Sequence, residues 1–176
     1  ARIRARMATA LMAVPAEDAT QLKEAKTEIE TALATLTAEG SDAEVAEAEM
    51  NLGLICQTLA GMHLLPIQPA ISAYQRSLRT FDKTNYPKEF AILQSNLANA
   101  LQYVSSSHRL ENGYRALEAY DEALKVRTIR DMPEEYANTI ANKANCLSNL
   151  PDDPQNPDGG NFGNLTEAVR LLEEAR

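Results

Sequence analysis

The sequence repeats itself at a period of about 45 residues, and this period constrains the fold more than any other feature. The segment from Ala70 to Leu78 (AISAYQRSL) aligns with the segment from Ala116 to Leu124 (ALEAYDEAL), 46 positions later. Related copies begin at Ala25 and at Ala168. Such a chain folds as stacked copies of one unit, because a single copy cannot bury its apolar face alone.

A second recurring unit alternates strictly with the first. It carries an asparagine two positions before a small residue, and its copies are 45 and 46 residues apart: Asn51-Leu-Gly, Asn96-Leu-Ala and Asn142-Lys-Ala. In both units apolar residues recur at every third or fourth position, as they do from Ile71 to Phe81. This spacing is typical of an amphipathic helix and not of a strand.

We therefore predict an all-α chain with about eight helices. Their expected ranges are 2–13, 18–38, 42–61, 67–83, 87–105, 111–130, 133–149 and 163–176. Consecutive helices pair into antiparallel hairpins, which gives repeat units over approximately 1–38, 41–83, 87–130 and 133–176. We expect the hairpins to stack as one solenoid domain, 1–176, with a concave and a convex surface.

Small residues recur where the two helices of a hairpin should meet. Ala25, Ala70 and Ala116 in one helix are expected to face Gly53, Ala98 and Ala144 in the other. Side chains of this size allow two helix backbones to approach closely, so the pairing predicts a tight contact within each hairpin.

With these residues in place, the chain resembles the tetratricopeptide repeats, in a long-period form known from bacterial multidomain proteins. The family pattern is Leu-Gly in one helix and Ala, aromatic, Ala in the next. It is matched by Leu52-Gly53 with Ala70, Tyr74 and Ser77, and again by Leu97-Ala98 with Ala116, Tyr120 and Ala123. Lys143 and Leu172 depart from it. The resemblance implies a right-handed solenoid that binds other proteins.

Asparagine recurs on one face of the helices that carry the second unit. The spacing i, i+3, i+7 places Asn96, Asn99 and Tyr103 on one face, and Asn142, Asn145 and Asn149 repeat it. Asn51 and Thr58 occupy equivalent places. In the family this face lines a concave groove, where amide side chains can hold a peptide backbone.

The resemblance thus implies a peptide-binding groove made of Asn51, Thr58, Asn96, Asn99, Tyr103, Asn142, Asn145 and Asn149. For Asn51, Asn96 and Asn142 an alternative stays open, in which the side chains bond to neighbouring helices or loops and fix the stacking. For Asn99, Asn145 and Asn149 the groove is the favoured interpretation.

Composition and motifs indicate no chemistry. Acidic residues outnumber Lys and Arg by 25 to 17, a net charge of −8, whereas a nucleic-acid binder needs the opposite excess. His63 and His108 lack partners at metal-ligand spacing, and the loop from Asp152 to Asn161 does not match a calcium loop. We expect no catalytic residue, no metal and no cofactor. The acidic run from Glu39 to Glu49 is interpreted as the solvated face of a helix, with a docking site for a basic partner as the alternative.

Two other functions remain open. The first is a structural spacer that self-assembles through the solenoid ends, which would make the chain a homo-oligomer. The second is a regulatory segment of a larger bacterial signalling or protease-like protein. Cys56 and Cys146 form no disulfide or redox motif, so a cytoplasmic location is expected; a signal-peptide core over residues 8–16 is the alternative.

No apolar run is long enough to insert into a membrane. The sequence begins at Ala1 instead of Met and stops at Arg176 inside an expected helix. We therefore expect the chain to be a fragment of a longer protein.

Overall fold

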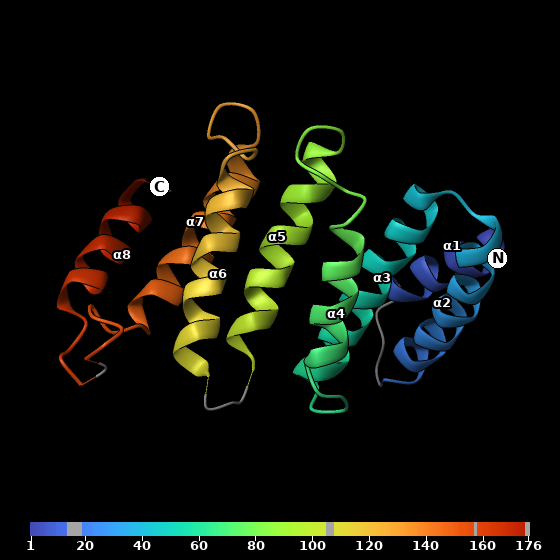
Figure 1. The fold of residues 1–176 in the computed structure, drawn as a ribbon, viewed down its shortest axis with the longest axis horizontal. Coiled ribbons are helices and arrows are strands. Elements are labelled where there is room, and N and C mark those ends of the chain that lie inside the picture. Colours follow the sequence, from blue (N-terminus) through green and yellow to red (C-terminus); the bar gives the residue numbers. More distant parts are fainter. Residues whose placement is uncertain (14–18, 105–107, 157, 175–176) are drawn as a thin grey trace. The chain divides into compact units, whose positions relative to one another are not determined.

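The computed structural model describes residues 1–13, 19–104, 108–156 and 158–174, and within these ranges all regular structure is helical (Figure 1). The helices are α1 (Arg2–Ala13), α2 (Thr20–Glu39), α3 (Asp42–Gly61), α4 (Gln68–Ser77), α5 (Pro87–Gln102), α6 (Arg109–Leu124), α7 (Pro133–Ser148) and α8 (Phe162–Glu174). The predicted all-α class is confirmed, and every predicted helix has a counterpart.

The helices form two compact units, Ala1–Tyr86 and Pro87–Arg176. In the first unit α1 packs on α2, α2 on α3 and α3 on α4, and α1 also touches α3. The second unit repeats this arrangement, with α5 on α6, α6 on α7, α7 on α8, and α5 touching α7. Each unit therefore contains two hairpins. We call α1, α3, α5 and α7 the first helices and α2, α4, α6 and α8 the second helices.

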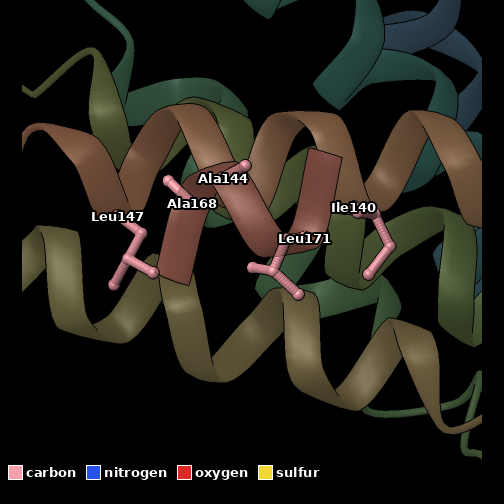
Figure 2. Packing of buried hydrophobic residues seen from close by; sticks show 5 residues of the cluster. All are labelled: Ile140, Ala144, Leu147, Ala168 and Leu171. Carbon is pink, nitrogen blue, oxygen red and sulfur yellow. The ribbon is translucent and has the colours of Figure 1, made fainter. Parts of the chain in front are cut away.

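The small residues expected at the hairpin contacts are buried. Ala25, Ala70, Ala98 and Ala116 have no exposed surface, and Ala144 is also buried. The last hairpin shows the packing directly, since Ile140, Ala144 and Leu147 of α7 meet Ala168 and Leu171 of α8 (Figure 2). Close approach between first and second helices is therefore the basis of the core.

Two helices end earlier than the sequence predicts. The range 67–83 is helical only to Ser77, and the range 111–130 only to Leu124. After α4 the Asp82 carboxylate accepts hydrogen bonds from the backbone N–H groups of Thr84 and Asn85, at 2.8 and 2.9 Å, and this turn replaces the last expected helical residues. After α6 the backbone N–H of Asp131 donates to the Thr128 hydroxyl in a similar turn.

Helix starts follow the local signals more closely. Ser41 and Glu44 form a reciprocal capping box at the start of α3, and prolines begin α5 and α7. At α8 the Asp152 carboxylate accepts from the backbone N–H groups of Gly163 and Asn164, at 2.8 and 2.7 Å. These caps satisfy N–H groups that a helix leaves unpaired at its first turn.

The segment 8–16 is the alternative signal-peptide core. Its residues 8–13 belong to α1, and Ala8 is fully buried there. Residues 14–16 lie outside the described part of the chain. None of the helices in the described ranges combines the length and the apolar character needed to cross a membrane.

Candidate binding surface

Asn51 links the first helices of the first unit. Its amide Nδ2 donates to the hydroxyl of Thr9 on α1, 3.3 Å away, and its side chain is half-buried. Thr58, two turns along α3, is exposed and donates its hydroxyl to the carbonyl of Leu54 in its own helix, at 3.0 Å. Asn51 thus bonds to the neighbouring first helix, whereas Thr58 stays on the surface.

A pocket of about 200 Å³ lies beside Asn51, between α1 and α3. Leu36 of α2 and Ala48 of α3 contribute its buried apolar lining. The polar lining residues are Arg2, Arg6, Thr9, Glu44, Glu47 and Asn51. Sequence analysis missed this pocket, because its polar residues come from two helices whose approach the repeat pattern does not specify.

The pocket holds charges of both signs. Arg2 donates to the Glu44 carboxylate, and this hydrogen bond, together with one from the Ser41 backbone, lowers the pKa of Glu44 to about 2. Arg6 and Glu47 are exposed and form no ion pair among the described residues. Within the described part of the chain, a cation and a carboxylate that form no ion pair therefore border the pocket.

The acidic run from Glu39 to Glu49 is not simply a solvated face. Glu44 pairs with Arg2, and the Glu49 carboxylate accepts two hydrogen bonds from Arg76 of α4, both 2.7 Å long. The interpretation of this run as solvated was wrong at these two positions, because arginines on neighbouring helices neutralise them.

In the second unit Asn99 takes part in the contact within a hairpin. The hydroxyl of Tyr120 on α6 donates to Asn99 Oδ1 and accepts from Gln102 Nε2, which lies 2.7 Å away. Tyr120 is fully buried, and this burial raises the pKa of its phenol. The carbonyl of Asn99 is therefore occupied by α6, although the sequence favoured a groove role.

The corresponding tyrosine and glutamine are also hydrogen-bonded one repeat earlier, with the donor and acceptor exchanged. Tyr74 of α4 is also fully buried and donates its hydroxyl to Gln57 Oε1 on α3, at 2.9 Å. Gln57 and Gln102 are 45 residues apart and so occupy one repeat position. Their recurrence is the sequence signal that could have revealed these tyrosine contacts.

The remaining candidate residues of the second unit differ in their exposure and in the hydrogen bonds of their side chains. Asn142 and Asn145 are exposed on α7, and within the described ranges their side-chain amides make no hydrogen bond. Asn149 is exposed too, but its Nδ2 donates to the backbone carbonyl of Asn145, at 2.7 Å, and closes the end of α7. Asn96 is half-buried, and Tyr103 is exposed directly after α5.

A second pocket, of about 350 Å³, lies beside Asn149 at the loop before α8. Arg109, Asp158 and Asn161 contribute its polar lining. Asn161 donates its amide to the backbone carbonyl of Ser148, at 2.7 Å, so part of the lining serves to hold the loop. The loop from Asp152 thus supports α8.

Nothing in the described part of the chain forms a cluster of His, Cys, Asp or Glu that could hold a metal ion. His63 lies at the end of α3 with φ 57°, and His108 Nδ1 lies 3.3 Å from the Glu111 carboxylate at the start of α6. Cys56 and Cys146 are buried free thiols, and burial raises the pKa of Cys146 to about 11. A thiol with so high a pKa is a poor nucleophile at neutral pH.

Comparison of the chain with models of protein families, with curated proteins and with solved structures gives no match.

Proposed function

We propose that this chain is a non-catalytic protein-binding module of the tetratricopeptide type. In this proposal its hairpins stack as a right-handed solenoid, and its first helices line a groove that receives an extended segment of another protein. The observation that carries the proposal is the pair of exposed amides at Asn142 and Asn145, which have no hydrogen-bonding partner among the described residues.

The arrangement of first helices supports a continuous surface within each unit. In the first unit the Asn51 to Thr9 hydrogen bond fixes which side of α3 faces α1. Asn142 occupies the repeat position of Asn51, so in this proposal it lies on the side of α7 that is next to α5, which α7 touches. An approaching peptide would meet Asn142 and Asn145 on this side, with Tyr103 near the end of α5.

The chemistry of these groups suits an extended backbone. Each peptide residue offers one N–H donor and one C=O acceptor, and each Asn side chain offers both complementary groups. Such contacts tolerate many sequences, whereas a pocket adds selectivity. In the first unit, Arg6 and Glu47 lie beside the pocket and form no ion pair among the described residues. They therefore favour a polar or charged side chain of the bound segment.

The two buried, unpaired thiols favour a reducing compartment, so we place the module in the cytoplasm. No nucleic-acid partner is proposed, because the net charge of −8 opposes phosphate binding.

A displayed library of unstructured peptides tests the proposal. Peptides selected on the immobilised chain are labelled, and their affinity is measured by fluorescence anisotropy. We expect the combined variant Tyr103→Ala, Asn142→Ala, Asn145→Ala to bind at least tenfold more weakly, which is about 1.4 kcal/mol. The matched control is Gln75→Ala with Glu118→Ala, two exposed polar residues on second helices, and it should bind as the wild type does.

Two results would contradict the proposal. In one, selection enriches no peptide above a blank surface. In the other, selected peptides bind equally well to the wild type, the groove variant and the control, which would place their site elsewhere. Circular dichroism of both variants shows whether the helices are retained.

A further inference from the structure

An apolar stripe runs along α8 beside its buried residues. Ala168 and Leu171 are buried against α7 (Figure 2), whereas Phe162, Leu165, Val169 and Leu172 are exposed large hydrophobic residues. Val169 is 56% exposed and Phe162 is 82% exposed. Their spacing of three and four residues places them on one face, which is the pattern of a helix surface that meets another helix.

The internal repeat shows what covers this face in the preceding hairpin. Val169 of α8 corresponds to Leu117 of α6, as Ala168 corresponds to Ala116. Leu117 packs against the cluster that Ile140, Ala144 and Leu147 of α7 form with Ala168 and Leu171 of α8.

Two further contacts mark the same side of α6. Asp121 pairs with Lys143 of α7, and the carbonyl of Gly113 lies 3.6 Å from Cys146 Sγ. The side of α8 that carries Val169 therefore corresponds to the side of α6 that carries Leu117. On α6 this side is covered by α7, the first helix of the next hairpin. In the first unit α3 likewise packs on α2.

The matching face of a first helix is exposed on α1. Ala8 of α1 corresponds to Ala144 of α7, so Ile3, Met7 and Ala10 correspond to Thr139, Lys143 and Cys146. Lys143 and Cys146 are the α7 residues that meet α6. Their counterparts in α1 are all apolar and exposed, and Ile3 is 84% exposed.

The charges of the two helices are complementary. α1 contains three Arg and no acidic residue, and α8 contains three Glu and one Arg. Arg6, beside Met7, forms no ion pair among the described residues, and Glu173 occupies the repeat position of Asp121. Arg6 lies one residue before Met7, the repeat position of Lys143, so an Arg6 to Glu173 pair would be shifted by one residue relative to the Lys143 to Asp121 pair of the α6 and α7 contact.

We propose that α1 of one copy of this chain packs on the exposed face of α8 of a second copy, head to tail, in the way that α7 packs on α6. The two surfaces differ, so the contact leaves one α1 and one α8 free in each dimer. Further copies can add at both free ends, which gives rings or filaments according to the rotation between copies.

The mass of the whole 176-residue chain, measured by light scattering over a concentration series, tests this directly. We expect the mass to rise with concentration beyond that of a dimer, and to fall as salt screens the Arg and Glu charges. A monomer at every concentration would overturn the proposal, and this result needs no variant.

Two variants test the direction of the contact. One carries Ile3→Glu and Met7→Glu on α1, and the other carries Leu165→Gln and Val169→Gln on α8. Each should remain monomeric alone, because one partner surface is lost. An equal mixture should form a dimer and nothing larger, since one intact α1 meets one intact α8.

Two controls complete the test. Ile129→Gln removes an exposed apolar residue outside both helices and should associate as the wild type does. The groove variant described above should also associate normally, so failure of peptide binding and failure of assembly are distinguishable.

Two results would overturn the proposal. Dimers of the α1 variant alone would indicate pairing of α8 with α8. A mixture that stays monomeric would exclude any α1 to α8 contact. Met7→Ser and Val169→Ser replace the double changes if circular dichroism shows lost helix.

Discussion

The ring of Tyr74 lies directly over Gly53, so that a Cβ atom at position 53 would stand 2.4 Å from Cε1 of the ring. Tyr74 is fully buried, and its hydroxyl donates a hydrogen bond to Gln57. The ring therefore cannot shift away from position 53 without disturbing its packing and this bond. Gly53 is therefore required by the contact between α3 and α4.

Gly53→Ala should lower the free energy of unfolding. Overpacking a well-filled contact costs about 1–3 kcal/mol, and the better helix propensity of alanine returns at most about 1 kcal/mol. Urea denaturation measures the difference. Gly61→Ala is the matched control, because nothing lies within 4 Å of a Cβ at that end of α3, and it should leave the stability unchanged or slightly higher. Equal midpoints for both variants would contradict the contact.

Buried phenols and thiols predict a loss of stability at alkaline pH. Burial raises the pKa of Tyr74 and Tyr120 above 10.0, and it raises that of Cys146 from 9.0 to about 11. Between these values the unfolded chain releases protons that the folded chain retains, so stability that is complete below pH 9 decreases as the pH rises.

Urea denaturation at a series of pH values checks this slope. We expect Cys146→Ala to flatten the part of the slope between pH 9 and about 11, because the buried group no longer titrates. A free energy of unfolding that is constant up to pH 11 would show that these groups are solvated.

The number of helices could be predicted from the sequence, whereas two of their ends could not. The repeat of about 45 residues and the apolar spacing are local signals, and they predict each helix. Leu78 and Phe81 continue that spacing beyond Ser77, yet the helix ends there. The decisive contacts are the Asp82 turn and the packing of the Phe81 ring on Tyr86, with ring centroids 4.9 Å apart.

The helix face that carries the recurring asparagines could be predicted as well, but the hydrogen-bonding partners of its side chains could not. Spacing places Asn99 and Asn145 on corresponding faces, although Asn99 bonds to Tyr120 and Asn145 stays exposed. The difference arises from the second helix of each hairpin, since Leu172 stands in α8 where Tyr120 stands in α6. Leucine offers no hydroxyl, so the Asn145 amide has no hydrogen-bonding partner on α8 in the described part of the hairpin.

The Arg2 and Glu44 pair predicts an acid-sensitive contact between α1 and α3. The hydrogen bond from Arg2 lowers the pKa of Glu44 from 4.5 to about 2. Its stabilising effect is therefore complete above pH 4.5 and is lost as the pH falls toward 2. Thermal unfolding followed over this range should show a shallower pH dependence in Arg2→Gln. Arg6→Gln removes a charge without an ion pair, so the same shallowing in that variant would contradict the assignment.

His63 ends α3 in a left-handed backbone conformation, with φ 57°. Its N–H donates to the carbonyl of Ala60 and the N–H of Leu64 donates to that of Leu59, both at 2.9 Å. Glycine adopts this conformation without steric cost, so His63→Gly should raise the free energy of unfolding by about 1 kcal/mol. Met62→Gly, at φ −85°, should not. Chemical denaturation distinguishes the two, and a destabilised His63→Gly would refute the strain.

Arg127 joins three segments of the second unit without an ion pair to a carboxylate among the described residues. Its Nη1 donates to the hydroxyls of Ser95 on α5 and Thr139 on α7, each at 2.8 Å, and burial lowers the pKa of the guanidinium. Because the group is half-buried, loss of either acceptor leaves a charged donor short of a partner. We expect Thr139→Val to cost about 1–3 kcal/mol of stability.

A double-mutant cycle separates this bond from the other effects of Thr139→Val. The Thr139 hydroxyl also donates to the carbonyl of Glu135 in its own helix, at 2.6 Å, and the valine removes that bond too. In an Arg127→Met background the same valine substitution should cost clearly less, since no guanidinium remains to be left unpaired. Equal costs in both backgrounds, measured by urea denaturation, would show that the Arg127 to Thr139 hydrogen bond adds no stability between α7 and the segment that follows α6.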